Sequence, residues 1–189
     1  IGVILTMTMI LFTAVAIVRE KERGNMELLI TTPVRTPELM LAKITPYVFI
    51  GLIQVTLVLL LGHFLFHVPM AGSLLDTYFI TLIFIVTNLA LGLVISTLVS
   101  TQFQAMQLSF FVLLPSILLS GFMFPFAGMP RPAQIIAEAL PLTHFIRLIR
   151  GVILRGASLQ ELSQEILILC GFIVVFMILA ILRFSKRLD

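Results

Sequence analysis

A charged segment, residues 19–43, lies between two runs of residues that are too apolar to fold anywhere but in a membrane. Its basic residues are Arg19, Lys21, Arg23, Arg35 and Lys43, and its acidic residues are Glu20, Glu22, Glu27 and Glu38. The stretch that follows, residues 44–130, carries a single charged residue, Asp76. We therefore expect the charged segment to lie in water, and its basic residues place it on the cytoplasmic side by the positive-inside rule.

Five segments approach or reach the roughly 20 apolar residues that a membrane-spanning helix requires. They are residues 1–18, 44–66, 74–99, 106–126 and 166–182. Hydrophobic residues make up 60% of the chain and charged residues 11%, against about 45–50% and about 25% in soluble domains. We predict an all-α polytopic membrane protein that forms one domain, residues 1–189. Because the chain begins inside an apolar run and without Met, we expect further sequence upstream.

The positive-inside rule also predicts the course of the chain. We expect three parts of the chain outside the cell: residue 1, the turn at 67–73 and residues 127–165. We expect the turn at 100–104 and the tail after Arg183 inside. The internal basic residues explain the net charge of +3, so it requires no nucleic-acid partner. Four arginines violate the rule, because they lie in the external segment: Arg131, Arg147, Arg150 and Arg155. The opposite orientation fits worse, since it would place the larger basic groups outside.

The external segment is predicted to hold two short helices. Gly121, Pro125, Gly128 and Pro130 should end the fourth span early, since proline lacks the donor that continues a helix. After Pro141, apolar residues recur at helical spacing: Phe145, Leu148, Ile149, Val152 and Ile153, with His144, Arg147, Gly151 and Arg155 on another face. We expect these helices to re-enter the membrane or lie along its outer leaflet. The apolar face of the helix after Pro141 should pack on the fourth and fifth spans, with Arg147 and Arg150 near phosphates or an external partner.

Local signals divide the charged segment into two stiff arms and a short helix. The first span should continue through residues 19–23 and end at Gly24, and Asn25 is a good cap for a helix over 26–31 that Pro33 stops. The sequence from Thr36 to Glu38 predicts a second helix start that leads directly into the second span. The short helix either lies on lipid headgroups as an anchor or binds a soluble partner. Physical reasoning alone leaves both interpretations open.

Three parts of the sequence resemble one family of membrane proteins. They are EKERGNMELLITTP at 20–33 with ELMLAK at 38–43, LPSILLSGFMFP at 114–125, and PLTHF at 141–145. Together they resemble type-2 ABC exporter permeases, especially bacterial drug-efflux permeases, and the resemblance covers essentially the whole chain. Asn25 stands where the family's pattern favours threonine, and it preserves the capping function.

The resemblance implies a half-transporter in a bacterial inner membrane. Family members have six spans per subunit, so the five spans here would be spans two to six, with a first span and any external domain missing. Residues 25–32 would match the coupling helix that docks on the ATP-binding subunit, and residues 130–155 the external re-entrant helices beneath the exit gate. The implied partners are an ABC ATPase subunit that binds ATP and magnesium, a second permease subunit, membrane lipid and a periplasmic adaptor protein. The candidate ATPase-coupling residues are Glu20, Glu22, Arg23, Gly24, Met26, Glu27, Leu28, Leu29 and Pro33.

The candidates for the transport pathway or its gate are Gln54, Asn88, Ser120, Phe122, Phe124, Phe126, His144 and Arg147. For Gln54 and Asn88 the alternative role is hydrogen bonding within the membrane. Asn88, Gly92, Ser96 and Ser100 recur every four residues, and this small, polar stripe favours close helix packing over a pathway. Ser120 and His144 could also form the pair of an intramembrane serine protease, which requires a hydrogen bond between nucleophile and base.

The function that these observations favour is ATP-driven export. The chain has no Gly-rich phosphate loop, and its second to fourth spans carry no charged residue apart from Asp76 at one end. Energy should therefore come from a separate subunit, not from nucleotide bound here or from a coupled ion. We predict a permease that moves an amphipathic drug-like or lipid-like molecule outward, with no catalytic, cofactor or metal site of its own. The alternative is a membrane anchor or assembly factor whose charged segment binds lipid.

Overall fold

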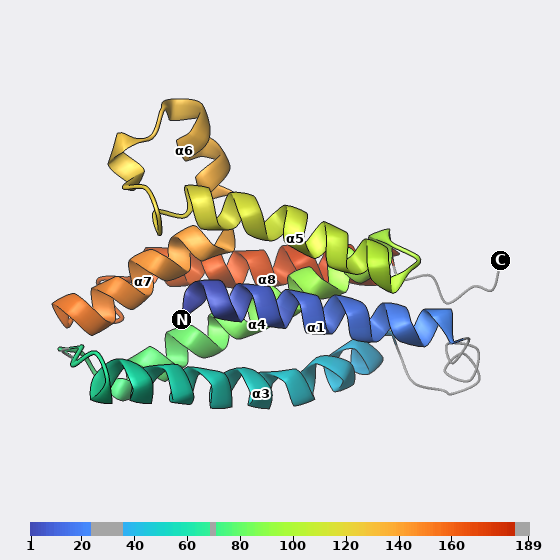
Figure 1. Cartoon of the computed structure of the whole chain (residues 1–189), viewed down its shortest axis with the longest axis horizontal. Coiled ribbons are helices and arrows are strands. Elements are labelled where there is room, and N and C mark those ends of the chain that lie inside the picture. The colour runs from blue at the N-terminus through green and yellow to red at the C-terminus, as the bar shows by residue number, and fades with distance from the viewer. Residues whose placement is uncertain (24–35, 69–70, 184–189) are drawn as a thin grey trace.

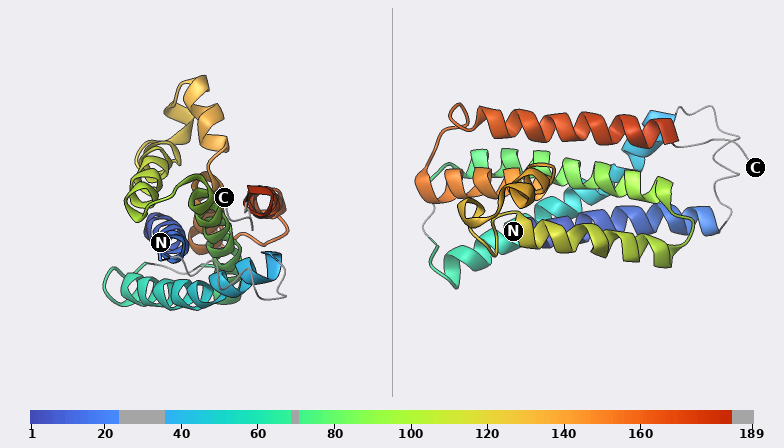
Figure 2. Two further views of the ribbon diagram at one scale, coloured as in Figure 1. Left: turned by 90° about the vertical axis from the view of Figure 1, so that its right-hand side faces the viewer. Right: turned by 90° about the horizontal axis from the view of Figure 1, so that it is seen from above.

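The computed structural model describes residues 1–23, 36–68 and 71–183, and the regular elements in these ranges are helices. In chain order they are α1 (Gly2–Glu22), α3 (Thr36–Phe64), α4 (Leu74–Leu98), α5 (Gln102–Leu119), the short 3-10 helix η1 (Phe126–Gly128), α6 (Arg131–Glu138), α7 (Pro141–Arg155) and α8 (Ser163–Arg183). The long helices form an elongated bundle, and α6 projects from its side (Figure 1). We call the end at which α1 stops and α3 starts the charged end. Viewed from that end, α1 lies between α3 and α5 (Figure 2).

Within the described residues, five helices are long and apolar enough to cross a membrane: Gly2–Glu22, Leu41–Phe64, Leu74–Leu98, Gln102–Leu119 and Ser163–Arg183. The prediction of an all-α polytopic membrane protein is confirmed. As predicted, α1 continues through Arg19 to Glu22, and α3 begins at Thr36 and runs without a break into the second span. The fourth span ends early, at Leu119, because Gly121 then adopts a left-handed φ of 84° that glycine tolerates at low cost.

Helix α4 is the centre of the bundle. It packs against α1, α3, α5, α7 and α8, and its buried residues include Asn88, Gly92 and Ser96 of the predicted stripe. A Cβ atom added to Gly92 would lie 2.8 Å from Cβ of Thr13 and 3.0 Å from the carbonyl oxygen of Ile10 on α1. The stripe therefore lets α1 approach α4 closely, in agreement with the packing interpretation.

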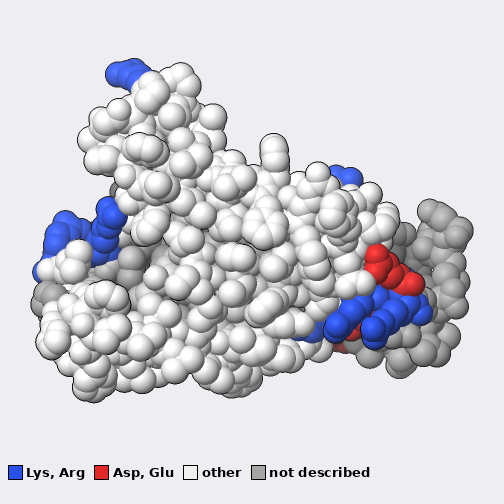
Figure 3. Space-filling view, viewed as in Figure 1, with Lys and Arg blue, Asp and Glu red and all other residues white. Residues whose placement is uncertain are grey.

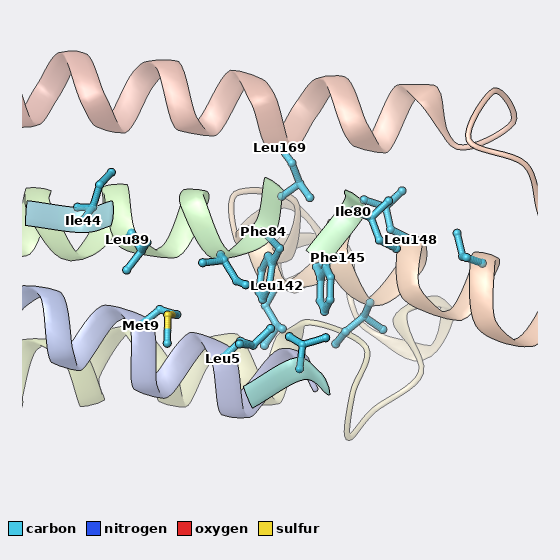
Figure 4. Close-up of a cluster of buried hydrophobic side chains, with 14 of the residues drawn as sticks. Leu5, Met9, Ile44, Ile80, Phe84, Leu89, Leu142, Phe145, Leu148 and Leu169 are labelled. Carbon is cyan, nitrogen blue, oxygen red and sulfur yellow. The ribbon is translucent and has the colours of Figure 1, made fainter. Parts of the chain in front are cut away.

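Helix α7 inserts its apolar face into this bundle. Leu142, Phe145 and Leu148 belong to the same buried cluster as Leu5 and Met9 of α1 (Figure 4). The ring of Phe145 stacks on the ring of Phe84 of α4, with centroids 4.0 Å apart and planes 8° from parallel. Such a pair adds roughly 0.5–1.5 kcal/mol beyond the burial of its area.

This packing corrects part of the prediction for α7. Its main partners are α4 and α8, whereas α5, the predicted fourth span, contributes less. His144 and Gly151 were placed on the polar face, yet both are buried. The reason is that α7 is covered on two sides, and the space at Gly151 is filled by Leu162, whose Cδ1 would lie 2.9 Å from an added Cβ. Whether α7 re-enters the membrane stays a prediction.

The close approach of α1 and α4 predicts unequal effects of two Gly→Ala substitutions. Gly92→Ala should lower the free energy of unfolding by about 1–3 kcal/mol, because the new methyl group overlaps backbone and side chain of α1. Gly171→Ala on α8 is the control, because no atom lies within 4 Å of its added Cβ. Thermal unfolding of the purified protein measures both, and equal losses would contradict the close contact.

Candidate functional site

The last turn of α1 joins three other helices at the charged end. We call its residues Glu20, Lys21 and Glu22 the α1 collar. Glu20 forms an ion pair with Lys43 of α3. The ammonium group of Lys21 donates a hydrogen bond of 2.8 Å to the carbonyl oxygen of Ser96 in α4. Glu22 accepts two hydrogen bonds from Gln102 of α5, one from its side chain and one of 2.9 Å from its backbone N–H.

Two of these bonds lie where a helix has unpaired backbone groups. Ser96 belongs to the last turn of α4, whose carbonyls have no partner within the helix, and a cation is favourable there. Gln102 is the first residue of α5, whose N–H groups are unpaired, and an anion is favourable there. The turn between α4 and α5 is also held by a capping box, in which Thr101 and Gln104 bond to each other's backbone. Lys21 and Glu22 therefore fix the turn from both sides.

The predicted coupling residues divide into two groups. Glu20, Glu22 and Arg23 are described, and two of them contact neighbouring helices of the same chain. Gly24, Met26, Glu27, Leu28, Leu29 and Pro33 lie outside the described residues, as does the predicted helix over 26–31. Charged side chains gather at the charged end and again at the opposite end, and the face between them carries few (Figure 3).

At the opposite end, four residues from three helices form what we call the outer cluster. These residues are Glu138 of α6, His144 and Arg147 of α7, and Glu165 of α8. The two terminal nitrogens of Arg147 donate to the two carboxylate oxygens of Glu138, at 2.5 and 3.2 Å, and one also donates to Glu165 at 3.2 Å. The guanidinium lies over the ring of Phe126 in η1, 4.6 Å from its centroid. Arg147 bonds to carboxylates of its own chain. Its expected position near phosphates or an external partner stays a prediction.

His144 is enclosed within the outer cluster. Its side chain is 1% exposed, its Nδ1 lies 2.5 Å from a carboxylate oxygen of Glu165, and its Nε2 lies 2.9 Å from the carbonyl oxygen of Glu138. Both ring nitrogens of His144 are therefore engaged by groups of the outer cluster. This geometry also leaves neither ring nitrogen for Ser120, so the protease pair is not formed.

The ion pair of Arg147 and Glu138 shifts the pKa of both groups. The hydrogen bond from Arg147 holds the pKa of the Glu138 carboxyl below its ordinary value, although partial burial acts in the opposite direction. The same hydrogen bond raises the pKa of the Arg147 guanidinium. The fixed α6–α7 contact is thus an ion pair at neutral pH.

The remaining pathway candidates are not brought together by contacts. Gln54 of α3 accepts a hydrogen bond of 2.9 Å from the hydroxyl of Thr8 in α1, and Asn88 donates one of 2.8 Å to Phe84 of its own helix. Both bonds fit the alternative of intramembrane hydrogen bonding. The hydroxyl of Ser120 is buried and has no hydrogen-bond partner among the described residues. Phe122 and Phe124, each 55% exposed, lie between α5 and η1.

Sequence reasoning missed Lys21, Gln102, Glu138 and Glu165. A signal for the two glutamates existed, because the external arginines that violate the positive-inside rule needed acidic partners nearby. For Lys21 and Gln102 no pattern pointed to contact, because their partners Ser96 and Glu22 lie 75 and 80 residues away in the sequence.

These features together define a membrane protein with several spans and polar contacts at both ends of its bundle. The family described as "ABC-2 family transporter protein" matches residues 1–182, and the chain belongs to this family. The resemblance inferred from the motifs is therefore confirmed, as is the prediction of a multi-pass membrane protein.

Several curated proteins with similar sequences agree with this assignment. The whole chain is 35% identical to the "probable multidrug ABC transporter permease YbhS" of Escherichia coli K12 and covers 50% of it. Over 85% of its length the chain is 34% identical to the "probable multidrug ABC transporter permease YbhR" of the same strain, of which it covers 44%. Over 97% it is 31% identical to the "inner membrane transport permease YhhJ", of which it covers 50%. The chain thus spans about half the length of these relatives, which are permeases. No solved structure matches it.

The α1 collar predicts that Lys21→Met lowers the free energy of unfolding by about 1 kcal/mol. The substitution keeps the apolar stem but leaves the carbonyl of Ser96 without its charged donor. Arg23→Met is the control, because the exposed Arg23 side chain makes no ion pair among the described residues. Thermal unfolding compares the two, and an equal effect of both substitutions would show that the Lys21 contact contributes nothing.

The outer cluster predicts a pH-dependent effect of Arg147→Gln. A carboxyl whose pKa is lowered by folding stabilises the fold above its unfolded pKa and loses this contribution as the pH falls through the folded pKa. Arg147→Gln should therefore cost about 1 kcal/mol at neutral pH, a low figure because 44% of the Glu138 side chain is exposed. The difference from wild type should shrink in acid. Thermal unfolding across pH, with the exposed Arg150→Gln as control, tests this, and a difference that persists in acid argues against the ion pair.

Proposed function

We propose that the chain is the membrane-embedded half of an exporter subunit that works with a separate ABC ATPase subunit. Membership of the ABC-2 family supports this assignment. The working unit would contain two permease subunits, identical or different, and two ATPase subunits. ATP and magnesium would bind to the ATPase, and the charged end of the bundle would face the cytoplasm.

The observation that carries the proposal is the α1 collar. Residues 24–35 connect α1 to α3 and would include the helix that docks on the ATPase. A push on this connection acts first on the end of α1 and the start of α3, which the pair of Glu20 and Lys43 holds together. Lys21 and Glu22 then pass the displacement to α4 and α5. Movement of one short segment would thereby reach four of the five spans.

The same contacts argue against a simple lipid anchor. An anchor that binds headgroups should direct its charges outward to phosphates. Here the collar side chains point to neighbouring helices, and two of them bond to helix ends. This arrangement supports a role in force transmission over a role in lipid attachment.

The substrate and the exit are also proposals. The relatives YbhS and YbhR are named as probable multidrug permeases, and by analogy the substrate would be an amphipathic drug-like or lipid-like molecule. It would leave between the two subunits near the exposed Phe122 and Phe124. A bacterial inner membrane is the proposed location, which is the location in the name of YhhJ. A periplasmic adaptor would meet the outer side.

The docking proposal predicts that Leu29→Asp separates the permease from its ATPase. A carboxylate at a position that enters an apolar groove would be buried without a partner, at a cost of at least ~1.4 kcal/mol, or about tenfold in affinity. Insertion into the membrane should not change, because the charged segment lies in water. Co-purification of the ATPase with the full-length permease measures the effect, with Leu29→Met as the conservative control. Undiminished co-purification and transport in Leu29→Asp would refute the docking role.

A further inference from the structure

An open groove with a volume of about 430 Å³ runs between α1 and α3, with α5 at its edge. We call it the α1–α3 groove. The residues that matter for its chemistry are Phe12, Ala16 and Arg19 of α1, Tyr47 and Ile50 of α3, and Met106 of α5. Its walls are apolar apart from Arg19 and the Tyr47 hydroxyl. A volume of this size lies within the range of about 300–1,000 Å³ that is typical of ligand sites.

Polar contacts close the α1–α3 groove at both ends. Toward the opposite end of the bundle, Thr8 bonds to Gln54, one helical turn beyond Phe12 and Ile50. Toward the charged end, Glu20 pairs with Lys43. The eleven steps along the chain from Thr8 to Arg19 correspond to a length of about 16 Å along α1. The groove is therefore a bounded trough within a candidate span.

Arg19 gives this trough a charge preference. It is exposed and lines the groove, and its guanidinium has no ion pair or hydrogen bond among the described residues. The adjacent acidic groups of the α1 collar are already engaged, since Glu20 bonds to Lys43 and Glu22 bonds to Gln102. A guanidinium with free donors at one end of an apolar trough matches a carboxylate, sulfonate or phosphate on an apolar body.

We propose that the α1–α3 groove is an access site for the transported substrate and that it selects amphiphiles with an anionic head group. The head group bonds to Arg19 near the membrane surface, and the apolar body lies along Phe12, Ala16 and Ile50. This inference rests on the proposed function, because it names the substrate class of that exporter. The described residues carry few charged side chains on the face shown in Figure 3 up to the charged end, and the lining of the groove is mostly apolar. In the described part of the chain, the groove is thus open to a molecule in the membrane.

Charge complementarity favours this occupant over a second copy of the chain. A second copy would have to bring an acidic group to Arg19, and Glu20 and Glu22, the acidic residues of the α1 collar, are already bonded. A neutral or cationic amphiphile would leave the guanidinium without a partner.

Binding is tested first on the full-length permease in nanodiscs of zwitterionic lipid, without ATPase or ATP. The probes are a fluorescent long-chain fatty acid and its methyl ester, which differ only in the charge of the head group. Arg19→Gln should weaken binding of the acid by roughly threefold to fivefold, a modest factor because the Arg19 side chain is exposed, and leave the ester unchanged. Arg19→Lys should retain most of the affinity, and Arg150→Gln, an exposed arginine at the opposite end, should have no effect.

A second variant tests the contribution of the apolar lining of the α1–α3 groove. Ala16→Phe fills the trough and should weaken the acid and the ester alike. Equal binding of acid and ester to the wild type, or an unchanged affinity in Arg19→Gln, would overturn the proposal. So would efficient cross-linking between two copies through Phe12→Cys in a Cys170→Ser background, because the groove would then be a subunit interface.

A third measurement separates a transported substrate from a resident lipid. In the complex with its ATPase, the acid should stimulate ATP hydrolysis by the wild type and not by Arg19→Gln. Binding without stimulation, in a complex that hydrolyses ATP, would show that the groove is not an access site. If no ATPase associates at all, the proposed function fails, and the binding result still decides whether the groove selects anions.

Discussion

Three consecutive charged side chains at the end of α1 each bond to a different helix. Helices in a membrane gain little from apolar burial against one another, because lipid is as apolar as their own side chains. Polar contacts therefore decide how far one span can slide along the next. Glu20, Lys21 and Glu22 supply such contacts to α3, α4 and α5, and the last two also satisfy backbone groups that a helix end leaves open.

The outer cluster has the corresponding role at the opposite end. Arg147 and His144 connect α7 to Glu138 of α6 and Glu165 of α8, so the helices after Gly121 are tied to the bundle although α6 projects from it. Helix α4 links the two ends, because it receives Lys21 at one end and stacks Phe84 on Phe145 of α7. This contiguous set of contacts would provide a route between the proposed ATPase side and the proposed exit.

The sequence predicted the spans well because their signal is local. Each signal acts within one element: the apolar length of a span, the proline that marks the helix start at Thr36, and Gly121, which ends the fourth span. The predictions of the five spans, of this helix start and of this helix end were confirmed. The burial of the two faces of α7 was harder to predict. Periodicity separates the two faces, but it does not show that α4 and α8 cover both. The partner of Lys21 lies 75 residues away in the sequence, so no spacing rule could identify it. The excess of external arginines indicated that Arg147 needs acidic partners, but it did not show which helices supply them. The predicted coupling helix lies outside the described residues and stays a prediction.

The central claim is that the α1 collar moves the charged ends of α1 and α5 as one unit during the ATPase cycle. Pulsed electron paramagnetic resonance tests this directly, with spin labels at Arg23, which follows the collar, and at the exposed Phe103 near the start of α5. In the full transporter, the distance between these labels within one subunit should be the same without nucleotide and with ATP trapped. The distance between the two Phe103 labels of the paired subunits should change. A change in the distance between Arg23 and Phe103 within one subunit would contradict the account.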